Sequence, residues 1–298
     1  MQHNIQQFLK RTIFFLGIPL LLFIILLIVL DFLSSRNIKN YQIDSNINSA
    51  FIGDSHIQQA VDARLIKNSI NLSQKGESFY FSYYKIEKLL KTHAHINKIY
   101  LGFSFHSLSS YYEDYIFGEY SKDISSRYFF IMPFRDKINL LRHNSEELPA
   151  YFKNVFHDAI GNTFRNNRNT ILGYYENNFS HTIVDEKYTK QRLQFQFYKN
   201  GKIRSFSEFN IAYLEKIIAL CRSRNVELVV LNTPLHEYYR SGIPTVYIKE
   251  YYLLIRKNNI QLIDFRDLPL SDRNFIPDGD HVSVEGAVKV SKYLDVMR

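Results

Sequence analysis

The chain of 298 residues contains a single cysteine, Cys221, and this scarcity excludes two kinds of architecture. One cysteine cannot form an intrachain disulfide, and metal sites built on cysteine thiolates need more than one. We expect Cys221 to pack within a helix. His93 and His95 could be imagined as metal ligands, but no cysteine or carboxylate completes a site near them, so we predict surface residues. We therefore expect neither a metal nor another cofactor.

A nucleic-acid-binding motif is also absent, although the composition is basic. Lys and Arg total 37 against 29 Asp and Glu, which gives a net charge of +8. These basic residues are scattered along the chain, so we expect no nucleic-acid partner. A net positive charge also favours binding to anionic lipid or to acidic polysaccharide. The 46% share of hydrophobic residues indicates a packed core rather than disorder.

Charge is absent from one long stretch near the N-terminus. Ile13–Leu30 contains no charged residue, and only Asp31 separates it from two further apolar residues. About 18–20 apolar residues suffice to cross a bilayer as a helix. A cleaved signal peptide is the alternative, but the run is long for its apolar region and no A-x-A-like cleavage site follows. We predict a short cytoplasmic N-terminus over 1–12 and a transmembrane helix over 13–33.

The segment after this helix is polar and rich in Asn and Ser over 34–48, which is typical of a tether. Lys10 and Arg11 before the helix are matched by Arg36 and Lys39 after it, so the charge pattern gives a weak signal for orientation. The chemistry described below favours an exported domain. We therefore predict a single-pass protein of the plasma (inner) membrane, with a cytoplasmic N-terminus and a periplasmic or extracellular C-terminal domain.

From Ser49 onward, short apolar runs alternate with helical patterns. We predict strands at Ala50–Ile52, Ile70–Leu72, Lys98–Phe103, Val226–Leu231 and Ile260–Asp264. Helices are predicted over 80–91, over 246–257 and from 284 to the C-terminus. A further helix precedes the fourth strand, where apolar residues recur at three- and four-residue steps from Phe206 and where Ser205 and Glu208 form a capping box. This order predicts an α/β fold, a flavodoxin-like three-layer sandwich with a five-stranded parallel sheet.

One stretch, about residues 107–204, breaks this alternation. It is rich in Tyr, Phe and Asn and has no clean helical or strand period. Loops of such length usually have a function or structure of their own. We interpret it either as an insertion that caps the site and lies against the membrane through its aromatic residues, or as a helical subdomain that only packs.

Reactive side chains follow the first and fifth predicted strands, and in a parallel sheet such strand ends share one edge. Gly53, Asp54 and Ser55 follow the first strand, which places Ser55 at a helix N-terminus where backbone N–H groups favour developing negative charge. A serine hydroxyl needs a base, and the three-residue spacing of Asp278 and His281 lets the carboxylate orient the imidazole. We predict a Ser55, Asp278, His281 triad.

Three further polar residues lie near these motifs or follow a predicted strand. Asp280 points away from the imidazole in the expected geometry and is interpreted as structural. His56 either lines the pocket or only begins the helix. His236 follows the fourth strand and either touches substrate or lies in a surface loop.

Gly53-Asp54-Ser55 after the first strand, together with Asp278-x-x-His281 before the last helix, resembles the SGNH (GDSL-type) hydrolase family. Gly76, in the loop after the second strand, is similar to the family's second block, whose glycine N–H helps to form the oxyanion hole. The resemblance covers about residues 49–298 apart from the insertion. It implies an oxyanion hole that includes the N–H groups of Ser55 and Gly76.

The third block of the family, Gly-x-Asn-Asp, is not matched. The corresponding segment is Gly102-Phe103-Ser104-Phe105-His106, which has no asparagine to donate to the oxyanion. Ser104 or His106 donates instead, or this donor is missing, and the loss of one such donor typically costs ~10²–10³ in rate. The segment also resembles the Gly-x-Ser-x-Gly elbow of α/β-hydrolases, but His106 would crowd the turn, which argues against Ser104 as nucleophile.

Similar departures occur in membrane-anchored relatives that act in cell-envelope acyl transfer, including the D-alanine-transfer protein of teichoic acids and alginate O-acetylation proteins. The apolar helix, the insertion and the Thr233-Pro234-Leu235-His236 strand exit resemble that branch. The resemblance implies a membrane-anchored serine esterase or O-acyltransferase acting on acyl esters of cell-envelope glycans, with a polytopic membrane O-acyltransferase as partner. The alternative is a non-catalytic accessory or glycan-binding subunit of an O-acylation system, which the missing asparagine motivates.

Overall fold

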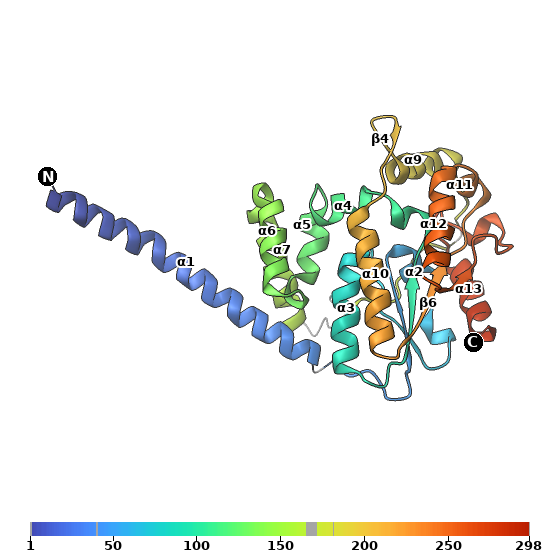
Figure 1. The fold of residues 1–298 in the computed structure, drawn as a ribbon, viewed down its shortest axis with the longest axis horizontal. Coiled ribbons are helices and arrows are strands. Elements are labelled where there is room, and N and C mark those ends of the chain that lie inside the picture. The colour runs from blue at the N-terminus through green and yellow to red at the C-terminus, as the bar shows by residue number, and fades with distance from the viewer. Residues whose placement is uncertain (1, 40, 165–171, 181, 298) are drawn as a thin grey trace.

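The computed structural model describes residues 2–39, 41–164, 172–180 and 182–297 (Figure 1). Its centre is a parallel sheet of five strands in the order β2-β1-β3-β6-β7. The strands are β1 Ser49–Ile52, β2 Ser69–Asn71, β3 Lys98–Gly102, β6 Glu227–Asn232 and β7 Gln261–Asp264. This confirms the predicted α/β fold with a five-stranded parallel sheet, and every strand lies within about a residue of its predicted bounds.

Helices cover both faces of this sheet, which makes three layers. Along β3, Ile99 and Leu101 pack on one face, whereas Tyr100 packs on the other, because successive side chains of a strand alternate. The first face is covered by α3 Phe79–Thr92, α10 Glu208–Ser223 and α12 Thr245–Lys257. The second is covered by α2 Ser55–Ala60 and α13 Val284–Val296. Burial on both faces explains why the strands read as uninterrupted apolar runs.

The start of α10 differs from the prediction. Ser207, rather than Ser205, is the N-cap, and its Oγ accepts a hydrogen bond from Asn210 N–H at 3.0 Å. Phe206 lies outside the helix because it forms an antiparallel bridge with Ser109. The extended pairing of the preceding residues therefore shifts the cap two positions toward the C-terminus.

The predicted insertion is largely helical where it is described. It contains α4 Tyr111–Ile116, α5 Ser121–Ile124, η3 Ser125–Ile131, α6 Phe134–His143, η4 Ser145–Glu147, α7 Leu148–Phe164, α9 Glu186–Phe197 and the hairpin β4 Tyr198–Lys199 with β5 Lys202–Ile203. Short connecting elements elsewhere are η1 Ala63–Leu65, η2 Phe105–Leu108, α11 Glu237–Ser241 and η5 Asp272–Asn274. In Figure 1, α6 and α7 form a lobe beside the N-terminal helix, while α4 and α9 lie over one end of the sheet.

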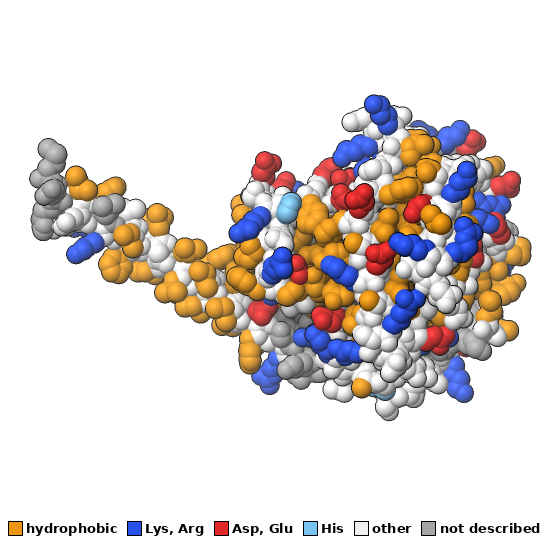
Figure 2. Space-filling model, viewed as in Figure 1, with side chains coloured by type: hydrophobic (Ala, Val, Ile, Leu, Met, Phe, Trp, Pro, Cys, Tyr) orange, Lys and Arg blue, Asp and Glu red, His pale blue; other side chains and the backbone are white. Residues whose placement is uncertain are grey.

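The N-terminal helix α1, Gln2–Lys39, projects from the domain as one long rod (Figure 1). Among the described residues, its segment Ile5–Leu33 is the one helix long and apolar enough to cross a membrane, and a signal sequence would pass the same test. Figure 2 shows hydrophobic side chains along the rod. The helix continues through the first six residues of the predicted tether, because no proline or glycine stops its propagation there.

Candidate active site

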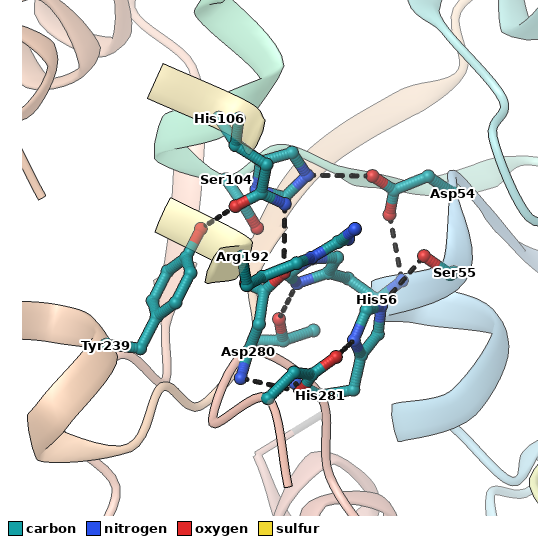
Figure 3. A network of polar contacts seen from close by, with 12 residues as sticks. Asp54, Ser55, His56, Ser104, His106, Arg192, Tyr239, Asp280 and His281 are labelled. Atoms are coloured by element: carbon teal, nitrogen blue, oxygen red, sulfur yellow. Dashed lines mark hydrogen bonds and ion pairs between the residues drawn. The ribbon is translucent and has the colours of Figure 1, made fainter. Parts of the chain in front are cut away.

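Ser55, His281 and Asp278 form a continuous chain of hydrogen bonds, although Ser55 and His281 lie 226 positions apart. Ser55 Oγ lies 2.8 Å from His281 Nε2, and His281 Nδ1 lies 2.7 Å from Asp278 Oδ2. Because an ionised carboxylate can only accept, Nδ1–H donates to Asp278, which leaves Nε2 to accept the Ser55 proton. The structure thus brings together the three residues predicted to form the triad, of which Ser55 and His281 are labelled in Figure 3.

The Asp278 carboxylate is held in its charged form. Its Oδ1 accepts the N–H groups of Asp280 at 3.0 Å and His281 at 3.1 Å, so the loop itself orients the carboxylate. Burial opposes the charge of Asp278, but the interaction with His281 outweighs burial and lowers the pKa of Asp278. A charged Asp278 can stabilise the imidazolium that forms when His281 takes a proton.

Ser55 is placed by the sharp passage from β1 into α2. Asp54 is the N-cap of α2, and its Oδ1 accepts the N–H of His56 at 2.9 Å. A Cβ atom on Gly53 would lie 3.1 Å from Gly102 Cα, so the ends of β1 and β3 approach too closely for larger side chains. Ser55 N–H lies in the first helical turn, where amides have no intrahelical acceptor. It is therefore available to an oxyanion on Ser55.

Gly76 lines the same pocket as Ser55 and His281, as the oxyanion-hole prediction requires. It has φ +77°, which L-residues with a side chain rarely adopt. A Cβ atom there would lie 2.8 Å from Ile124 Cδ1, so helix α5 of the insertion packs directly on this glycine. Both the positive φ and the lack of room for a Cβ atom therefore explain why residue 76 is a glycine.

Replacing Gly76 by alanine is expected to lower ester turnover by up to ~10²–10³-fold, because the displaced loop no longer aims its N–H at the oxyanion. Gly201→Ala is the matched control, since Gly201 has φ +74° but nothing within 4 Å of its built Cβ. Steady-state hydrolysis of a small ester measures the loss of turnover, and thermal unfolding of both variants measures any loss of stability. Equal losses of turnover in the two variants would contradict a special role for Gly76.

The pocket around Ser55 has a volume of about 260 Å³. Several of its walls come from the insertion, so part of this segment borders the pocket. These insertion residues are Tyr111, Tyr112, Tyr115, Ile124, Phe179 and Arg192. Burial raises the pKa of Tyr111 and of Tyr112 well above the ordinary value, so both phenols stay protonated, and the Tyr112 hydroxyl donates to Asp54. The pocket therefore offers aromatic faces and hydroxyl groups beside the serine.

A buried polar network lies behind the triad (Figure 3). Its first part holds Asp54, whose Oδ2 accepts hydrogen bonds from His106 Nε2 at 2.9 Å and from the Tyr112 hydroxyl. Burial alone would raise the pKa of Asp54, but the nearby His56 and the hydrogen bond from His106 outweigh burial and lower it. The network thus secures the residue that caps α2 and precedes Ser55.

Ser104 and His106, the two candidates for a third oxyanion donor, both make other contacts in or near this network. His106 Nε2 is engaged with Asp54 and does not point a free proton toward Ser55. Ser104 is buried as the N-cap of η2, its N–H donates to Ser107 Oγ at 3.1 Å, and it is not among the residues that line the pocket. Ser104 lies at the turn from β3 into η2. Its contribution to the oxyanion hole therefore has no support from its position.

The second part of the network surrounds His56, for which the sequence left two interpretations open. His56 Nε2 lies 3.2 Å from Asp280 Oδ2, and Arg192 Nε donates to the same oxygen at 2.7 Å. Burial opposes a charge on His56, but Asp280 and Asp54 outweigh it and raise the pKa of His56. The His56 and His281 ring centroids lie 4.5 Å apart. His56 and Asp280 thus form a buried imidazole–carboxylate pair beside the His281 ring.

Two sets of side-chain atoms in this network lie within 4.8 Å of one another and have the chemistry of metal ligands. They are Asp54, His56 and His106, and His56, Asp280 and His281. Each set contains carboxylate–imidazole pairs at hydrogen-bonding distance, and these contacts account for the close approach. Triad chemistry at Ser55 needs neither set to hold an ion.

The surface position predicted for His93 is wrong, and His236 fits neither of its two interpretations. His93 is not a surface residue, because it is buried and its Nε2 bonds with Tyr41 O at 2.9 Å, which ties the end of α3 to the segment after α1. His236 is also mostly buried, and it caps α11 by accepting the N–H of Tyr238. Neither residue lines the pocket around Ser55.

Comparisons with known proteins give only weak similarities. A family model that carries no functional description matches residues 156–297. No curated protein matches the chain. Among solved structures, a provisionally named platelet activating factor from Streptococcus pneumonia is 14% identical, with a TM-score of 0.37 over 94% of this chain and 98% of its own.

Two Bacteroides structures are similar at the same level. A GDSL-like lipase from Bacteroides thetaiotaomicron is 8% identical, with a TM-score of 0.38 over 88% of this chain and 94% of its own. A provisionally named acylhydrolase from Bacteroides fragilis is 9% identical, with a TM-score of 0.38 over 89% and 93%. TM-scores this low carry no argument about activity.

Proposed function

We propose that the chain is an SGNH-type serine esterase or O-acyltransferase anchored in a membrane. The observation that carries the proposal is the hydrogen-bond chain from Ser55 through His281 to Asp278, at the floor of a pocket that also contains Gly76. A serine, a base and an orienting carboxylate in this sequence of contacts are the parts that nucleophilic acyl chemistry requires.

In the first half of the reaction, Ser55 Oγ attacks the acyl carbonyl carbon while His281 Nε2 takes the hydroxyl proton. The resulting oxyanion accepts hydrogen bonds from the N–H groups of Ser55 and Gly76. Collapse of this intermediate breaks the ester bond, and His281 returns the proton to the leaving alkoxide. The acyl group remains as an ester on Ser55. Attack by water or by a sugar hydroxyl, with His281 again acting as base, then releases it.

We place this chemistry on cell-envelope glycans outside the plasma (inner) membrane. Helix α1 supports an anchor, residues 1–12 before its apolar run would be cytoplasmic, and the tyrosine faces of the pocket suit sugar rings. A polytopic O-acyltransferase that exports the acyl group would be the natural partner. An acyl group passed to a sugar hydroxyl yields transfer, whereas one passed to water yields hydrolysis.

A charged fluorophosphonate probe, which cannot cross the inner membrane, tests the nucleophile and the orientation together. In spheroplasts or intact cells that express the full chain, we expect one adduct, located by peptide mass spectrometry on Ser55. Labelling after lysis only would place the domain on the cytoplasmic side. A lack of labelling under both conditions, or an adduct on another serine, would overturn the assignment of Ser55.

A second candidate function is a non-catalytic accessory or glycan-binding subunit. It is favoured by one observation, that neither Ser104 nor His106 is placed to supply the missing asparagine donor. Such a subunit would support envelope O-acylation equally well with alanine at position 55. Complementation of a deletion strain by Ser55→Ala therefore distinguishes the two functions.

A further inference from the structure

A cleft of about 880 Å³ lies where α1 meets the domain. Its walls come from α1, α3, η3 and α6, and it shares no residue with the pocket around Ser55. Neither the triad nor the buried network uses it. Figure 2 shows that the hydrophobic surface of α1 continues onto the lobe of α6 and α7 beside it.

One end of the cleft is apolar and open. Ile28 of α1 and Phe134 of α6 are 63% and 77% exposed, whereas Phe129 and Phe130 at the back are buried against Leu30. Large exposed side chains around an apolar cavity are unfavourable in water, and such a cavity does not hold water well. This end therefore suits a hydrocarbon chain.

The depth of the apolar end follows from the helix geometry. If Asp31 marks the membrane interface, Ile24 lies about 10 Å deeper at 1.5 Å per residue, within the hydrocarbon region. Helix α7 reaches a similar depth, because Phe23 contacts the Phe152 and Phe156 rings at centroid distances of 5.1 and 5.8 Å. The cleft thus opens at the level of the acyl chains in one leaflet.

The other end of the cleft carries charge. Lys88 and Lys91 of α3 and Lys137 of α6 line it, together with the acids Asp31 and Glu87. Lys137 pairs with Asp31 at 2.6 Å, and Lys91 pairs with Glu87 at 3.0 Å. The lining thus holds more basic than acidic side chains, which favours an anionic headgroup such as a phosphodiester.

We propose that this cleft binds one anionic phospholipid, with an acyl chain against the apolar wall of α1 and the phosphate beside the lysines of α3. The proposal goes beyond the reaction at Ser55 but depends on α1 spanning the membrane, which is part of the proposed function. The bound lipid would fix the lobe of α6 and α7 on the leaflet surface.

The same η3 segment also contacts the loop that carries Gly76. Arg127 Nη1 donates to Lys75 O at 3.1 Å, and the Tyr128 hydroxyl donates to Glu77 Oε2 at 3.0 Å. The next two residues, Phe129 and Phe130, line the lipid cleft. One short segment therefore joins the lipid site to the candidate oxyanion loop.

Native mass spectrometry of the full chain, released from detergent micelles with added lipid, tests the proposal. We expect wild type to retain phosphatidylglycerol about tenfold more than phosphatidylcholine of the same acyl chains. Lys88→Gln/Lys91→Gln should reduce retention of phosphatidylglycerol by about tenfold, because each lysine beside an anionic lipid contributes several-fold. Lys187→Gln/Lys190→Gln on α9 is the matched control, with the same spacing and with Lys190 paired to Glu186 at 2.7 Å. It should retain lipid as wild type does.

Ile138→Trp, which fills the apolar end, should reduce retention of both lipids and gives a second variant. Fluorophosphonate labelling of Ser55 and the thermal unfolding of each variant verify its fold. Equal retention of the two lipids by wild type, equal effects of the two lysine pairs, or no retained lipid would overturn the proposal, the last pointing to a partner helix as occupant. Failure of the full chain to enter lipid nanodiscs would refute the anchor and the lipid site, while labelling of Ser55 would remain as a separate result.

Discussion

Alanine at position 55 is expected to lower ester turnover by roughly 10⁴–10⁶-fold, the range seen when the nucleophile of a serine triad is removed. Ser55 is the only pocket residue whose hydroxyl contacts His281 Nε2 in the described structure, so no neighbouring hydroxyl can take its place on the base. Release of a chromogenic alcohol from a short-chain ester by the full chain in micelles measures the loss. Residual turnover would come from binding and the oxyanion donors alone.

His281→Gln should cause a loss of similar size, and the double variant Ser55→Ala/His281→Gln should be no slower than either single variant. Residues that act as one unit are not additive, because removing either one disables the same step. Ser223→Ala, at an exposed serine of α10, is the control and should keep wild-type turnover. If Ser55→Ala keeps more than about a tenth of the activity, another nucleophile operates, and Ser104→Ala is the next variant to measure.

The sequence was sufficient to predict the sheet and the meeting of the two motifs. Strands buried on both faces are short, uninterrupted apolar runs, and β1 and β6 were recognisable for that reason. Parallel strands end at one edge, so residues after the first and fifth strands were expected to meet, as Ser55 and His281 do. These predictions needed only periodicity and spacing within single elements.

The buried network behind the triad could not be predicted in the same way. Arg192 and Tyr112 come from the insertion, whose sequence has no clean period and so gave no indication of which residues face the sheet. Their contacts with Asp280 and Asp54 depend on tertiary packing. The sequence indicated that His56 and Asp280 lie near the two motifs, and a buried histidine needs a hydrogen-bonding partner, but nothing in the sequence paired them.

Replacing Lys85 by methionine is expected to lower the free energy of unfolding by about 3–5 kcal/mol, the usual cost of leaving one member of a buried ion pair alone. Lys85 and Glu77 form a salt bridge with both side chains fully buried, and Lys85 Nζ also donates to Leu72 O at 2.7 Å. Burial lowers the pKa of Lys85 and raises that of Glu77, so each charge depends on its partner. Because tryptophan is absent, far-ultraviolet circular dichroism in urea is the suitable measurement.

A double variant separates the effect of this ion pair on stability from its effect on ester turnover. Glu77→Leu/Lys85→Met should recover part of the loss, because a neutral pair leaves no buried charge, although the Tyr128 hydroxyl then loses its acceptor. Lys257→Met, whose partner Glu215 is on the surface at 3.3 Å, is the control and should cost under ~1 kcal/mol. A Lys85→Met cost as small as the control would contradict the buried pair. Glu77 directly follows Gly76, so we expect turnover in the double variant to fall even where stability recovers, as the loop loses one of its two hydrogen bonds to η3.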